Sequence, residues 1–384
     1  MGTLAVTMSK HEHHDQHSHA FDFKAAFSVS TEPGSLVKIV GDIPWAEVEM
    51  ERKMAIKNLG KDLELPGFRK GYVPENMLVK HLGEMRIVAE MAERAIAHMY
   101  GHILDAHQID AIGQPKVEIT KLEPNKPLGI LILVAVLPKI TLPDVKAIAS
   151  TVNKEKADIL VTEEDVEAQV QDILRRKVAF DRLQAKAKAK ADGKTLEEET
   201  EETDPEKLPL PPLTDDLVKT LGQPGQFTDS ADFKAKIKEH LTIEKAREVE
   251  SGHRAKLTDA IIEQTAFELP QILIDSELSQ MFAHMEEDIT RAGLKLDDYL
   301  AHVKKTRDDL RKEWTPAAEK RARLQLILNE IAKVEKIVPD SAAVENEVEA
   351  LLKLHKEADP RRVRVYVESV LTNEAVLKML ESAK

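Results

Sequence analysis

The residues best suited to chemistry lie in one loop, Pro66–Pro74, whose sequence is Pro-Gly-Phe-Arg-Lys-Gly-Tyr-Val-Pro. Prolines bound the loop, and its two glycines permit tight turning because glycine adopts positive φ without strain. This pattern predicts an exposed tip that presents Phe68, Arg69 and Lys70. An aromatic beside an arginine suits a protein interface, and two cations suit phosphate or carboxylate groups. An equally compatible alternative is a turn between helices with Phe68 packed into the core.

Histidines form two other groups with chemical potential. Five of them lie between His11 and His19, a density that would bind Ni²⁺ or Zn²⁺ in solution. The group lacks the fixed spacing of a structural site, so residues 1–20 are interpreted as a flexible tail or a purification tag. His98 and His102 have i, i+4 spacing but no identified third ligand. The sequence therefore predicts no metal site and no cofactor.

An enzyme is a competing hypothesis with little support. The sequence has scattered histidines and carboxylates, but no catalytic motif connects them: His81, His98, His102 and His107, with Asp105 and Asp110. Isolated histidines on helices are more often packed or solvated than catalytic. The sequence contains no glycine-rich phosphate loop, so a nucleotide-driven motor is not indicated. No catalytic residue is predicted.

Composition narrows the class of protein. A chain of 384 residues accommodates two or three domains, and 4% aromatic with 32% charged residues favours a helical, strongly solvated protein. The net charge of −13 argues against general nucleic-acid binding, so any such contact must be local. Between Pro44 and Arg86, eight basic residues face seven acidic ones, and the bases gather around the loop.

The location of the protein follows from what the sequence lacks. There is no cysteine, which fits the cytosol. The longest apolar run, Leu128–Leu137, is too short to span a bilayer, and the first residues contain no signal-like apolar stretch. We expect a soluble cytoplasmic protein that does not bind membranes.

The N-terminal part, residues 21–143, predicts an α+β domain. Its alternating and helical apolar patterns follow the order β-β-α-α-α-β-β. The expected strands are 21–30, 35–42, 116–122 and 129–137. Two expected helices begin at Pro44 and Pro74, and a third spans 84–107.

The remainder divides into a connector and a helical region. Residues 144–212 predict a connector whose helix begins at Thr162, loses its apolar stripe before Ala185–Ala191, and leads to an acidic, proline-rich linker. Residues 213–384 predict an elongated all-α domain with few aromatics. Such narrow bundles are expected to leave some apolar side chains partly exposed, and flexible methionines suit promiscuous binding surfaces. The candidate contacts are Met281, Phe282, Met285 and Trp314.

The loop in this context resembles the trigger factor family of ribosome-associated bacterial chaperones. The core of the match is Gly67, Phe68, Arg69, Lys70 and Gly71. The resemblance extends more loosely over 23–148 and resumes at 213–222 and 268–277. It implies that the loop docks at the ribosomal tunnel exit, against a ribosomal protein and nearby RNA. It also implies that helical arms shield nascent or unfolded polypeptides, and it leaves open a homodimer away from the ribosome.

One departure from the family pattern concerns a domain. Members of the family usually carry a prolyl-isomerase domain between the two parts. Here only about 35 residues, 178–212, are available, fewer than the roughly 50 that a domain usually needs. The stretch is polar and almost free of aromatics, so it cannot build an apolar pocket for proline. The sequence therefore predicts no prolyl-isomerase activity.

Two functions remain after these steps. The first is an ATP-independent holdase that binds unfolded chains through many weak apolar contacts. The alternative is a scaffold or assembly factor that uses the same loop and arms for a folded partner. Client breadth separates them, because a chaperone suppresses the aggregation of unrelated proteins and a scaffold does not.

Overall fold

The computed structural model describes residues 21–61, 74–191, 210–223 and 226–384. The chain forms two compact units. Unit 1 comprises Met1–Pro143 and Ile262–Lys378, and unit 2 comprises Asp144–Ile261 and Met379–Lys384. The tail predicted for residues 1–20 lies outside the described residues. The predicted division into 21–143, 144–212 and 213–384 remains a prediction.

Unit 1 contains an antiparallel sheet in the order β1-β2-β4-β3. Alternation of apolar residues along the central strands turns one face inward, since successive side chains point to opposite sides. Ile39 of β2 is paired with Ile132 of β4, and both are fully buried. The strands are β1 Phe27–Glu32, β2 Leu36–Ile43, β3 Ala111–Lys121 and β4 Leu128–Val136.

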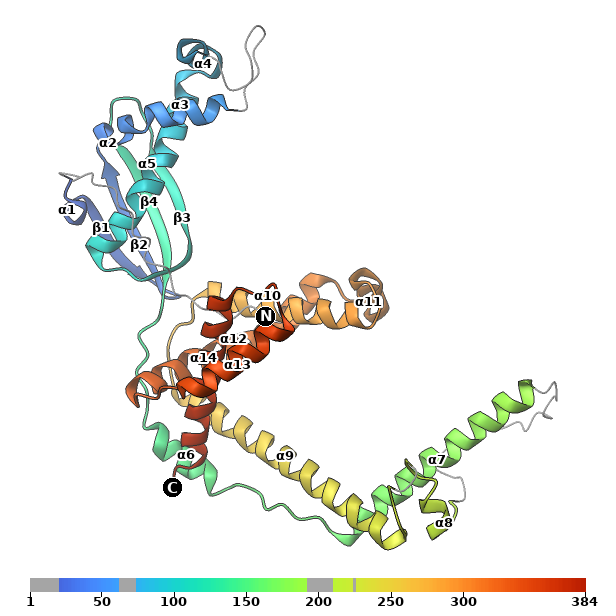
Figure 1. The fold of residues 1–384 in the computed structure, drawn as a ribbon. Coiled ribbons are helices and arrows are strands. Elements are labelled where there is room, and N and C mark those ends of the chain that lie inside the picture. Colours follow the sequence, from blue (N-terminus) through green and yellow to red (C-terminus); the bar gives the residue numbers. More distant parts are fainter. Residues whose placement is uncertain (1–20, 62–73, 192–209, 224–225) are drawn as a thin grey trace. The chain divides into compact units, whose positions relative to one another are not determined.

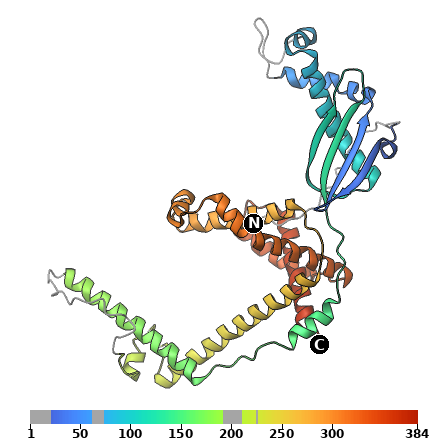
Figure 2. The ribbon, with the colours of Figure 1, turned by 180° about the vertical axis from the view of Figure 1, so that it is seen from behind.

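Helix α5, Glu84–His107, crosses the inward face of this sheet (Figure 1). Its apolar residues recur with helical spacing, and Ile87, Met91 and Ile103 are completely buried against the strands. The opposite face of the sheet is visible in Figure 2, where the strands lie in front of α5. Three shorter helices pack on α5: α2 Trp45–Met50, α3 Arg52–Gly60 and α4 Glu75–Leu82.

The predicted α+β fold is confirmed, with three local corrections, the first of which is that β3 begins at Ala111 and not at Lys116. The chain from Phe21 to Ala26 is not strand, because the Asp22 carboxylate accepts hydrogen bonds from the backbone N–H groups of Lys24 and Ala25. This cap starts the short helix α1, Phe23–Ala26, and β1 follows it. The helix expected after Pro44 is divided at Glu51 into α2 and α3.

The rest of unit 1 is helical, as predicted. Its helices pack in pairs, with separate small cores between α10 and α12 and between α13 and α14. Ala318 and Ala322 of α12 are buried against α10, where their small side chains allow close approach. The helices are α10 Gln271–Arg291, α11 Leu296–Val303, α12 Arg307–Val334, α13 Ser341–Leu354 and α14 Pro360–Glu381.

Two segments that carry the family resemblance meet within unit 1. The Glu268 carboxylate accepts a hydrogen bond from the backbone N–H of Gly34, in the turn between β1 and β2. The Ser35 hydroxyl donates to the Glu268 carbonyl at 2.7 Å. Gly34 has φ +79°, which explains the need for glycine at this turn.

Unit 2 contains α6 Val145–Asn153, α7 Glu163–Ala191, α8 Asp215–Val218 and most of α9 Ser230–Gln264. The predicted start of α7 is confirmed, because the Thr162 hydroxyl accepts from the Asp165 N–H at 3.2 Å. The helix continues through the alanine and lysine run to Ala191, since both residues are strong helix formers. No helix among the described residues is long and apolar enough to cross a membrane.

Hydrogen bonds hold the last residues of the chain against α6 within unit 2. The Asn153 side-chain amide donates to the carbonyls of Leu380 and Ala383, at 2.9 and 2.8 Å. Its oxygen lies 2.8 Å from the His253 ring nitrogen. Arg254 and Glu381 form a bidentate ion pair in the same unit. Burial is the largest cause that lowers the pKa of His253, and the positive charge of Lys156 acts in the same direction.

Adjacent residues of β2 offer a test of the sheet core. Ile39→Ala removes a fully buried side chain and is expected to cost about 2–5 kcal/mol of the free energy of unfolding. Val40→Ala, on the partly exposed opposite face, is expected to cost less than about 1 kcal/mol. Urea denaturation of both variants measures the difference, and equal losses would contradict the assigned faces.

Candidate binding groove

An open, mainly apolar groove lies between α10, α11 and α12 of unit 1. Its volume is about 630 Å³. It is lined by Met281, His284, Met285, Asp288, Ile289, Ala292, Leu294, Tyr299, Trp314 and Arg321.

The turn after α10 shapes one end of this groove. Gly293 has φ +76°, and the Leu294 N–H donates back to the Ile289 carbonyl at 3.1 Å. This pattern ends a helix with a left-handed residue and directs the chain sharply into α11. Leu294 is left exposed at the groove. The next turn leads to α12, which begins with a capping box between Thr306 and Asp309.

An aromatic pair joins α10 to α12 at the groove. The rings of Phe282 and Trp314 have centroids 4.9 Å apart. The Arg307 guanidinium lies 5.3 Å from the centroid of Phe282 and also donates to Glu286 at 2.6 Å. A cation over an aromatic face is attracted by the ring quadrupole. These contacts hold Trp314 at the groove wall.

The lining of the groove has few polar side chains, and they lie among apolar ones. His284, Asp288 and Arg321 are exposed side chains of the lining. Nearby on α10, burial raises the pKa of the Glu277 carboxyl, although Arg321 opposes the shift. A groove of this kind offers apolar contact with a little charge, and it holds no arrangement for bond-making chemistry.

The structure brings three of the four predicted contact residues together. Met281, Met285 and Trp314 line the groove and are half-buried. Phe282 was expected to remain partly exposed, but it is only 6% exposed because Trp314 and Arg307 cover its ring. The predicted docking loop residues Gly67, Phe68, Arg69, Lys70 and Gly71 lie outside the described residues.

Sequence patterns did not single out the other lining residues. Ile289 belongs to the same apolar stripe as Met281 and Met285, so its helix face was predictable. Leu294 and Tyr299 reach the groove only because the chain reverses at Gly293. Glycine directly after an apolar stripe was an available signal for that reversal.

A second, smaller groove lies where α12 leads to α13 and α14. Its volume is about 360 Å³, and Ile337, Val338, Pro339 and Val344 supply its apolar lining. Val338 is 82% exposed and adds apolar surface to this groove. Arg364 and Glu368 of α14 add charge at its border.

The described residues contain no group of three or more metal-ligating side chains. The two histidines with i, i+4 spacing have other contacts. His98 lies 3.6 Å from the Glu51 carboxylate, and the His102 ring packs 5.5 Å from Phe23.

Comparisons with known proteins give a consistent result. A family model described as bacterial trigger factor protein matches residues 25–173, and a model of the trigger factor C-terminus matches 230–382. Trigger factor of Halothermothrix orenii is 23% identical, over 87% of this chain and 91% of that protein. Trigger factor of Desulforamulus reducens is 27% identical, over 84% and 88%.

A solved structure of the trigger factor chaperone, described for promiscuous substrate recognition in folding and assembly, covers 93% of this chain and 100% of that one. Its TM-score is 0.48 at 16% identity.

An α+β domain, a helical region with open apolar grooves and the two family-model matches define the class as a molecular chaperone. The two family models together cover most of the chain, at residues 25–173 and 230–382. The chain belongs to the trigger factor family.

Proposed function

We propose that this chain is an ATP-independent cytoplasmic holdase that shields nascent or unfolded polypeptides at the ribosome. The observation that carries the proposal is the open groove formed by Met281, Met285 and Trp314. Methionine adapts its shape to different ligands, and an open groove selects for apolar character rather than for one sequence. Family membership supports the same function.

The size of the groove sets the strength of client binding. Burying one large apolar side chain contributes about 1.5–3 kcal/mol. Association itself costs at least about 4 kcal/mol. A groove of about 630 Å³ has room for only a few client side chains, so one such site holds a client weakly. Useful retention then requires several contacts at once, and the groove beside Val338 is a candidate for another.

Docking at the tunnel exit is assigned to Gly67–Gly71 by resemblance to the family signature. The aromatic and the two cations of this loop suit a surface made of protein and RNA. The docking contact and the client groove then use different side chains, so each can be removed without the other.

We further propose that the chain lacks prolyl-isomerase activity. The family models leave residues 174–229 between them. Within that interval the described residues form the end of α7 and the short α8. A site that binds a proline ring needs an enclosing apolar pocket, and so short an interval offers few residues to build one.

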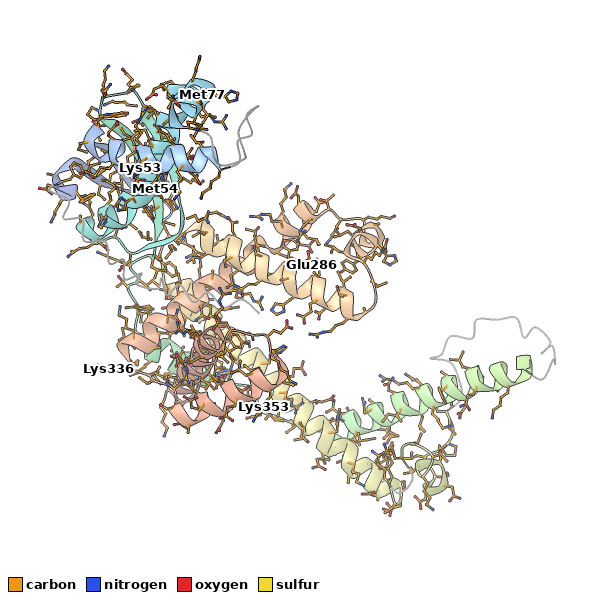
Figure 3. All side chains as sticks on the ribbon, turned by 45° about the horizontal axis from the view of Figure 1, so that its top comes forward. Lys53, Met54, Met77, Glu286, Lys336 and Lys353 are labelled. Carbon is orange, nitrogen blue, oxygen red and sulfur yellow. The ribbon has the colours of Figure 1, made fainter. Side chains whose placement is uncertain are left out.

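Client shielding is tested with two unrelated guanidinium-denatured enzymes diluted into the chaperone. Met281→Gln/Met285→Gln is expected to require about two- to threefold more chaperone for equal suppression of light scattering, because polar amides weaken apolar contact. Met50→Gln/Met54→Gln, at two exposed methionines of α2 and α3, is the matched control (Figure 3 labels Met54). Suppression of neither enzyme by the wild type would favour a scaffold.

Docking is tested by co-sedimentation with bacterial ribosomes at low and moderate salt. Phe68→Ala/Arg69→Ala/Lys70→Ala is expected to abolish pelleting while its thermal melt stays unchanged. Lys116→Ala/Lys121→Ala removes two exposed cations of β3 in the same domain and is expected to pellet normally. If the triple variant unfolds, the loop is a buried turn and the docking proposal is wrong.

The absence of isomerase activity is tested with a proline-containing peptide. Its cis-to-trans conversion is expected to keep the uncatalysed time of tens to hundreds of seconds in the presence of the protein. A known prolyl isomerase serves as the positive control. Clear acceleration by this chain would overturn the proposal.

A further inference from the structure

The two halves of α7 have different surroundings within unit 2. The first half packs against α9 and α8 through Val166, Val170 and Leu174. Its acidic side chains pair with lysines of α9: Glu163 with Lys238, Asp165 with Lys245 and Glu167 with Lys234. The second half extends past this contact, as Figures 1 and 2 both show.

Apolar side chains in the second half have no such cover. Phe180 is 57% exposed and Leu183 is 66% exposed. They are three residues apart, so they lie next to each other on one face of the helix. Arg176 precedes Phe180 by four residues and lies on the same face. An exposed aromatic beside cations supplies the ring and the positive charge with which proteins bind single-stranded nucleic acid.

The charge of this half is strongly positive in an acidic protein. From Arg175 to Lys190 the sequence has seven basic residues and one acidic residue, whereas the whole chain carries −13. The nearby carboxylates are already paired, Asp172 with Arg176 and Asp181 with Lys177. Arg182 and Lys188 form no ion pair with any residue that the structure describes.

We propose that the second half of α7 is a docking surface for RNA. Arginine and lysine bind phosphate, and the exposed ring of Phe180 is a platform for stacking an unpaired base. An anionic membrane is less compatible, because two large apolar side chains make too narrow a face for insertion. This surface uses other residues than the Gly67–Gly71 loop and the groove, so it can be tested independently of both proposed contacts.

The test measures fluorescence anisotropy of a labelled, unstructured RNA of roughly 20 nucleotides with the full chain in about 50 mM salt. Arg182→Glu/Lys188→Glu is expected to weaken binding about tenfold or more, and to reduce the salt dependence by roughly one to two phosphate contacts. Phe180→Ala is expected to weaken binding about fivefold or more through lost stacking. Circular dichroism verifies that each variant stays helical.

The matched control is Lys333→Glu/Lys353→Glu, which makes the same charge change at exposed positions of α12 and α13 (Figure 3 labels Lys353). It is expected to bind RNA within about twofold of the wild type, and so is Phe68→Ala/Arg69→Ala/Lys70→Ala. The proposal is overturned by an absence of saturable binding, by an equal loss in the control, or by dependence on the loop. Sedimentation with anionic phospholipid vesicles but no RNA binding would assign the surface to membranes instead.

Discussion

A shortage of large apolar side chains is the constraint on which the structure depends. Aromatics make up 4% of the sequence and charged residues 32%. Long helices with this composition can bury only a narrow stripe each, so the described buried residues of the helical regions fall into separate small clusters. Ion pairs between helices, such as Arg311 with Asp275 at 2.6 Å, complete the packing at the exposed sides. Exposed pairs of this kind add little stability, so the helix pairs rely on their narrow apolar seams.

The same constraint creates the candidate site. Where α10 meets α12, Ala318 and Ala322 allow close contact along one part of the seam. Farther along, Trp314 is too large to be enclosed by its neighbours, and the chain turns away at Gly293 before α11 returns. The result is an apolar hollow between helices that remain firmly paired below it. The hollow is therefore a product of helix geometry, and no strained backbone or buried charge is needed to keep it open.

Sequence periodicity was sufficient for the fold and only partly sufficient for the site. Alternation identified β2 and β4, and helical spacing identified α5, because an element that buries one face carries apolar residues at regular intervals in the sequence. The predicted start of the first strand at Phe21 was wrong, since capping by Asp22 competes with apolar alternation over so few residues. Phe282 was wrongly expected at the surface, because a stripe does not tell which member faces a partner helix. Leu294 and Tyr299 were missed because tertiary chain reversal brings them to the groove.

Shallow binding also bears on the proposed independence of this chaperone from nucleotide. A machine that encloses its client must spend free energy to open again, whereas a client in an open groove leaves at the rate its weak contacts allow. Met285 and Trp314 stay half-exposed, so water reaches the contact and no conformational barrier needs to precede release. Retention then depends on how many apolar segments the client exposes, a number that falls as the client folds. Folding itself would release the client, because each buried segment removes one contact.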